Sequence, residues 1–137
     1  MSDARKISFL ATTNSKRPTD LMPYLPLKLE RGGKSIDVLG LVDSGASINV
    51  LPYTIGLELG AIWEEQTTFF KLSGNLANQE ARGLLLRAKI ADFPPINLAF
   101  GWTESDDMPV ILGQINFFTT FDIFFYGSQY EFEIKTR

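Results

Sequence analysis

Short apolar runs, each bounded by turn residues, follow one another along most of this 137-residue chain. Residues 24–30 and 35–42 alternate between apolar and polar side chains, and the turn between them at 31–34 contains two glycines, which is the pattern of a β-hairpin. Further strands are predicted at residues 7–10, 66–72, 79–90, 96–102, 110–113, 122–126 and 130–134. So many short strands predict a mostly β protein, either a small closed β-barrel or a sandwich.

Short helices are predicted between some of these strands. Pro52 opens a helix that ends near Gly60, since proline suits the first helical turn and glycine the position after the last. One or two further helical turns are predicted at residues 116–121. Residues 1–22 are mostly polar and are interpreted as an N-terminal arm, whereas residues 23–137 are interpreted as one domain.

The composition limits the chemistry that this chain can perform. It contains neither cysteine nor histidine, which excludes disulfides, thiolate nucleophiles, imidazole bases and zinc fingers. An enzyme of this composition has carboxylates, Lys or Tyr for acid–base work, and no metal or cofactor is implied. The net charge of −3 disfavours nucleic acid and anionic membranes as partners. Without an apolar leader or a run of about 20 apolar residues, we expect a cytoplasmic protein that does not bind membranes.

Three patterns are better explained by structure than by function. Residues 33–35, Gly-Lys-Ser, match the end of a phosphate-binding loop but lack its earlier glycine and its following helix, so they are interpreted as a hairpin turn. An acidic loop lacks the ligand spacing of a calcium site and is interpreted as solvated; it contains Glu104, Asp106 and Asp107. Several phenylalanines are predicted to lie in the core or in an oligomer interface: Phe117, Phe118, Phe121, Phe124 and Phe125.

The tetrapeptide Asp43-Ser44-Gly45-Ala46 is the strongest candidate site. The apolar strand before it delivers one carboxylate at its end, and the small residues leave room for another backbone to approach. An apolar run that begins at Ile48 follows it. A second buried strand that ends in glycine, residues 111–113, comes about 70 residues later, where a barrel would bring it alongside.

These features resemble the retropepsin-like aspartic proteases, the single-domain family of retroviral proteases and their bacterial relatives. The resemblance runs from about residue 23 to residue 134. Residues 41–46, Leu-Val-Asp-Ser-Gly-Ala, fit the first signature of the family, and residues 110–113, Val-Ile-Leu-Gly, fit the second. The fold that this resemblance implies is a small closed β-barrel with one or two short helices.

The resemblance also implies roles for individual residues. Asp43 is the catalytic carboxylate, supported by Ser44, Gly45 and Ala46. Residues 69–86 fall where the family carries its flap hairpin, and the tip of that hairpin would be Ser73, Gly74 and Asn75. The flap and the cleft walls are expected to bind extended peptides with apolar side chains, the walls being formed by Ala46, Ile48, Val110 and Ile111.

Peptide hydrolysis by this route needs two carboxylates about 3 Å apart that share one proton, because like charges at that distance cannot both ionise. The chain has one Asp-Ser-Gly signature, so the second carboxylate is expected from a second copy in a two-fold symmetric homodimer. The resulting prediction is an aspartic endopeptidase. One alternative is a catalytically inactive retropepsin-like module for dimerisation or peptide binding. Another is an unrelated small β-barrel in which Asp-Ser-Gly occurs by chance.

Two departures from the retroviral pattern concern the dimer. Where those relatives carry a charged pair next to the signatures, this chain has Ser47 and Gln114. The dimer is therefore expected to rely on backbone pairing and apolar burial, supplied by residues 117–126 and 130–134. The alternation in 130–134 puts Tyr130, Phe132 and Ile134 on one face, which packs either on a partner or on its own barrel.

Overall fold

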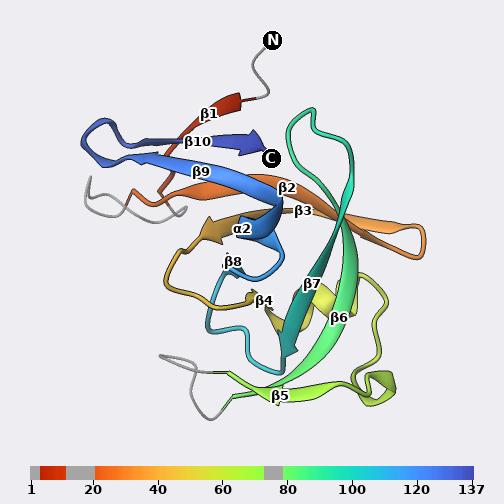
Figure 1. Ribbon diagram of the computed structural model, residues 1–137. Coiled ribbons are helices and arrows are strands. Elements are labelled where there is room, and N and C mark those ends of the chain that lie inside the picture. Colours follow the sequence, from red (N-terminus) through yellow and green to blue (C-terminus); the bar gives the residue numbers. More distant parts are fainter. Residues whose placement is uncertain (1–3, 12–20, 73–78) are drawn as a thin grey trace.

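The computed structural model describes residues 4–11, 21–72 and 79–137 (Figure 1). Ten strands are present in this part of the chain: β1 (Ala4–Ser8), β2 (Tyr24–Arg31), β3 (Lys34–Val42), β4 (Asn49–Leu51), β5 (Phe69–Lys71), β6 (Glu80–Lys89), β7 (Ile96–Thr103), β8 (Val110–Leu112), β9 (Phe121–Tyr126) and β10 (Glu131–Thr136). The helical segments between them are short: α1 (Tyr53–Glu58), η2 (Trp63–Glu65), α2 (Phe117–Thr120) and η4 (Gly127–Gln129). The prediction of a mostly β protein is confirmed.

Six strands close into a barrel. Their order is β2-β3-β8-β4-β7-β6, and β6 pairs back with β2 to complete the ring. The closing pair is short, because β2 contacts β6 only through Lys28 to Glu30. Pro26, which lacks a backbone N–H, lies in the part of β2 that pairs with β3 alone. The closed ring excludes the sandwich and confirms the predicted barrel.

Turn residues determine where the first barrel strands reverse. Arg31 pairs with Lys34 across the β2–β3 turn, and Gly32 and Gly33 between them have positive φ angles of 54° and 82°. Glycine adopts such angles without steric cost, which is why this hairpin is readable from sequence. The predicted first helix is also present, and Gly60 after it has a φ of 79°.

The main core fills the barrel and extends under the terminal sheet. Its largest fully buried side chains include Trp102, Phe100, Phe117 and Phe121, each contributing about 1.5–3 kcal/mol by burial. The five phenylalanines predicted to lie in the core or in an interface fall into two groups. Phe117 and Phe121 are core residues and Phe118 packs against the core, whereas Phe124 and Phe125 are 48% and 43% exposed.

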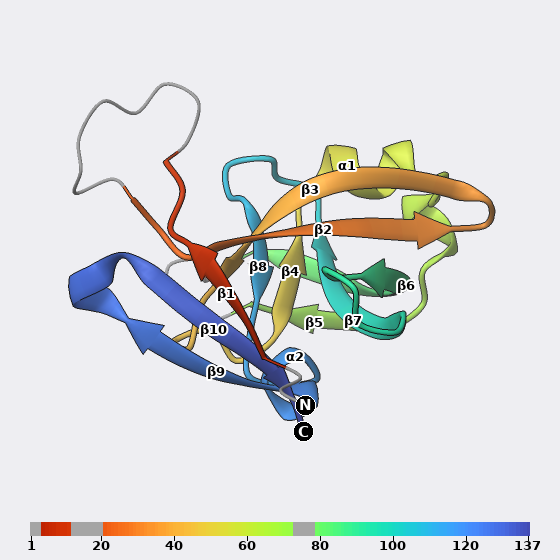
Figure 2. The same cartoon turned by 90° about the horizontal axis from the view of Figure 1, so that it is seen from above.

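The chain ends form a separate three-stranded sheet in the order β1-β10-β9 (Figure 2). β1 lies within the segment interpreted as an N-terminal arm, begins earlier than the predicted strand and pairs with β10 of its own chain. Phe132 and Ile134 of β10 are fully buried in the main core. Their face therefore packs on its own barrel, and Tyr130 lies outside the strand and is half exposed.

A second, smaller core cluster lies beside the main one. It joins β4, β8, the β5–β6 hairpin and the loop after β7, and its buried members are Val50, Leu72, Ala81, Met108 and Ile111. These side chains come from segments far apart in the sequence, so the cluster fixes those segments relative to one another. No helix among the described residues is long and apolar enough to cross a membrane.

Candidate active site

Asp43 follows directly on the end of β3. Val42 pairs in parallel with Leu112 of β8, and the N–H of Asp43 continues this pairing by donating to the carbonyl of Leu112 at 3.0 Å. The half-buried Asp43 side chain accepts a hydrogen bond on Oδ1 from the N–H of Gly45 at 2.9 Å. The strand thus delivers one carboxylate at a defined position, as the sequence predicted.

The Asp43 loop is joined to the second signature by backbone contact. The N–H groups of Gln114 and Ile115 donate to the carbonyls of Ala46 and Ser47, both at 2.9 Å. A Cβ on Gly113 would stand 2.4 Å from the carbonyl oxygen of Ile48, so only glycine fits at this position. The strand-and-glycine pattern of residues 111–113 therefore has a physical cause.

Gln114 adds a side-chain link between the two signatures. Its Nε2 donates a hydrogen bond to the carbonyl oxygen of Ser44. The position that departs from the retroviral pattern therefore still braces the Asp43 loop, with a neutral amide and within one chain. The exposed Ser47 makes its contact through its backbone.

The fully buried side-chain amide of Asn49, which the sequence reasoning missed, supports the segments that carry the two signatures. Asn49 Oδ1 accepts from the N–H of Gly113 at 2.8 Å, and its Nδ2 donates to the carbonyl of Ala99 at 3.0 Å. The N–H of Ala99 in turn donates to Oδ1 of Asn116, which has a φ of 78°. The two asparagines thus tie β4, β7 and the turn after β8 together next to the signature loops.

The Asp43 carboxylate faces a cleft of about 800 Å³. Of the predicted site residues, Gly45, Ala46, Ile48 and Ile111 line it with Asp43. The cleft is also lined by Leu41, Ser47, Val50, Leu72, Gln79, Ser105, Asp107, Met108 and Pro109. Exposed Ser44 is next to the lining, where its carbonyl binds Gln114.

Besides Ser44, two groups of predicted site residues are not part of this lining. Val110 belongs to the main core, because side chains alternate along β8 and only Ile111 points to the cleft. Ser73, Gly74 and Asn75 lie outside the described residues. The arms of the predicted hairpin are described, and they pair from Phe69 with Arg82 to Lys71 with Glu80. Beyond the arms, the N–H of Leu72 donates to the carbonyl of Gln79.

The acidic loop has a more specific structure than the predicted solvated loop. Asp106 accepts two hydrogen bonds from Thr54, one from its hydroxyl at 2.6 Å and one from its backbone N–H at 2.9 Å. These bonds, the hydroxyl first, hold the pKa of the Asp106 carboxyl below its usual value. Asp106 thereby caps the start of α1, where Pro52 has no side-chain acceptor to offer. Asp107 beside it lines the cleft instead.

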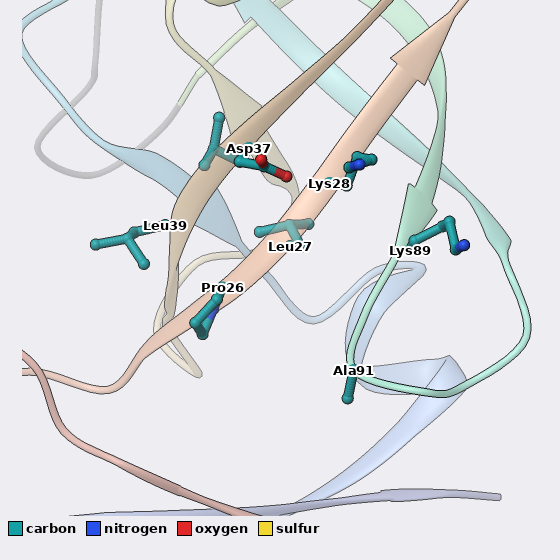
Figure 3. Close-up of a pocket in the computed structure, with 8 residues that line it drawn as sticks. Pro26, Leu27, Lys28, Asp37, Leu39, Lys89 and Ala91 are labelled. Carbon is teal, nitrogen blue, oxygen red and sulfur yellow. The ribbon is translucent and has the colours of Figure 1, made fainter.

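A second hollow, of about 490 Å³, shares no lining residue with the Asp43 cleft (Figure 3). Lys28 stands there between Asp37 of β3 and Lys89 of β6, its register partners on either side. Asp37 opposite a lysine is typical of a stabilising cross-strand pair. No group of three or more acidic residues suited to a metal ion occurs in the described part of the chain.

No family model matches this sequence, and no curated protein matches it. The structure is similar to a crystal structure of a retropepsin-like aspartic protease from Rickettsia conorii, with a TM-score of 0.64 and 15% sequence identity. The similarity covers 99% of this chain and 94% of that chain. The chain has a retropepsin-like fold. Within this fold, the two signatures singled out in the sequence are hydrogen-bonded to each other, and residues of both line the cleft.

Proposed function

We propose that the chain is an aspartic endopeptidase that acts as a homodimer. The observation that carries the proposal is the Asp43 loop. This loop presents a carboxylate at the wall of a large cleft and is joined by backbone hydrogen bonds to the second signature. The fold that contains both is retropepsin-like. In this mechanism one carboxylate of a pair takes a proton from water while the other donates a proton to the scissile carbonyl.

The second carboxylate comes from a second copy of the chain. Asp107 is the other acidic residue among the described residues of the cleft lining, but it shares no hydrogen bond with Asp43 and belongs to a different loop. Ser44 and Gly45 beside Asp43 are exposed, which leaves the loop accessible to a partner. A two-fold axis next to this loop brings the two Asp43 side chains together.

Strand β9 supports this arrangement. It forms one edge of the terminal sheet, and in the described part of the chain it pairs only with β10. Figure 2 shows β9 as the outer strand of the terminal sheet, on the opposite side of β10 from β1. An unprotected edge strand with half-exposed phenylalanines is a pairing surface, so antiparallel pairing of β9 with the β9 of a partner is the proposed interface.

The cleft suits an extended peptide with apolar side chains. Ile48, Val50 and Ile111 form apolar walls, and Leu72 and Gln79 extend them from the β5–β6 hairpin. A peptide in this cleft lies close to backbone groups of the hairpin, so strand-like hydrogen bonding supplies affinity without demanding a particular sequence.

Cleavage of a mixed peptide library near pH 5, analysed by mass spectrometry, tests the proposal. We expect cleavage by the wild-type chain, inhibition by a statine-type aspartic protease inhibitor, and loss of cleavage in Asp43→Asn, whose amide keeps the shape but takes no proton from water. Circular dichroism and sedimentation of the variant show whether fold and assembly are retained. Peptide binding without cleavage by the wild type would support the inactive binding module instead.

A further inference from the structure

Asp107 is an acidic group at the cleft whose carboxylate has no partner among the described residues. Its backbone N–H donates to Ser105 Oγ at 3.1 Å, but no donor reaches its exposed carboxylate among the described residues. Neither a Lys nor an Arg is present in the described lining of the cleft. The described lining of the cleft therefore carries two acidic groups, Asp43 and Asp107, without a compensating cation.

The neighbouring Asp106 shows what a structural role looks like in the same loop. Its carboxylate is fully engaged by Thr54 at the start of α1. The Asp107 side chain makes no such contact, although Met108 next to it is buried in the small core and fixes the loop there. Asp107 is thus held at the cleft wall by its backbone while its charge stays free.

We propose that Asp107 is a specificity-determining residue that selects peptides with a Lys or Arg close to the apolar residues at the scissile bond. This inference rests on the proposed protease function and names the substrate class of that same site. A cationic side chain passing the cleft wall gains a charge-assisted hydrogen bond to Asp107, and an acidic one is repelled by both carboxylates.

The proposed dimer gives this preference a recognisable form. A two-fold axis through the Asp43 pair places one Asp107 on each side of the bond that is cut. The preference for Lys or Arg therefore appears at symmetric positions, at equal spacing before and after the cleaved bond. A single pocket that binds one Lys or Arg would give a preference on only one side of the cleaved bond.

The test compares library cleavage by the wild type, Asp107→Asn and Glu104→Gln. Glu104→Gln is the matched control, because Glu104 is an exposed acid of the same loop that does not line the cleft. We expect the wild type and Glu104→Gln to favour Lys or Arg at symmetric positions. For a peptide with lysine there, Asp107→Asn should lower kcat/KM about fivefold, mainly through KM, and leave a matched norleucine peptide unchanged.

A binding measurement keeps this inference separate from the protease proposal. Fluorescence anisotropy with labelled lysine and norleucine peptides needs no turnover, and we expect tighter binding of the lysine peptide by the wild type but not by Asp107→Asn. The difference should shrink in 1 M salt, where the screening length is about 3 Å. Absence of cleavage with this binding pattern would reject the protease alone. Equal binding of both peptides by the wild type, or a lysine preference that persists in Asp107→Asn, would overturn the role of Asp107.

Discussion

Two loops each bring a carboxylate to the same cleft, but they are held in different ways. Backbone hydrogen bonds to residues 112–115 and a contact that only glycine permits hold the loop at 43–48. The loop at 104–109 has one backbone hydrogen bond, from the N–H of Tyr53 to the carbonyl of Ser105, and is otherwise held by side chains, with Asp106 bound to Thr54 and Met108 in the small core. Substitutions next to the first loop are therefore expected to destabilise it. The second loop is expected to keep its position when Asp107 is substituted, because the Asp107 side chain does not hold it.

The largest expected effect is at the glycine that touches the Asp43 loop. Gly113→Ala places a methyl group 2.4 Å from the Ile48 carbonyl oxygen, so we expect a loss of about 3 kcal/mol in the free energy of unfolding and loss of cleavage. Gly127→Ala is the control, because a Cβ there meets no atom within 4 Å, and it should change stability by less than about 0.5 kcal/mol. Urea denaturation measures both, and equal stability of the two variants would refute the described loop contact.

The next effect concerns the buried amide that supports the first loop. Asn49→Ala removes the partner of the Gly113 N–H and of the Ala99 carbonyl, so we expect a loss of about 2–3 kcal/mol. Asn97 is an exposed asparagine on β7, and we expect Asn97→Ala to leave the free energy of unfolding almost unchanged. Thermal unfolding followed by circular dichroism distinguishes them, and a neutral Asn49→Ala would show that the network contributes no stability.

A smaller effect is expected in the second loop, and it depends on pH. Asp106→Ala removes the cap of α1 and should cost about 1 kcal/mol at pH 7. The folded state holds the pKa of Asp106 below its usual value of 3.8. The contribution of Asp106 is therefore present above about pH 4 and is lost as the pH falls through the lowered pKa.

The neighbouring aspartate provides the control for that prediction. Asp107→Ala should leave stability within about 0.5 kcal/mol of the wild type, since no donor among the described residues contacts its carboxylate. Urea denaturation at pH 7 and pH 3 measures both variants. An equal loss of stability in Asp106→Ala and Asp107→Ala would erase the distinction between a structural and a free carboxylate.

The sequence predicted the features that depend on local patterns. Alternation and the two glycines at 32–33 indicated the first hairpin, and the two signatures indicated the Asp43 site before any geometry was known. Val110 was assigned to the cleft because an apolar run does not reveal which face of β8 each residue occupies.

What the sequence missed depends on contacts between distant segments. Asn49 reads as an ordinary polar residue until the fold brings it to Gly113, 64 positions away. Asp106 reads as part of an acidic loop until it meets Thr54, 52 positions away. Phe132 and Ile134 fit an interface as well as a core, and only the position of the terminal sheet decides between them.

The most direct test of the central claim is a mixing experiment with wild-type and Asp43→Asn chains at constant total concentration. If each active site needs one Asp43 from each of two copies, mixed dimers are inactive and activity follows the square of the wild-type fraction. An equal mixture should then retain about one quarter of the activity of the pure wild type. Retention of about one half, linear in the wild-type fraction, would show that one chain is sufficient and would contradict the shared site.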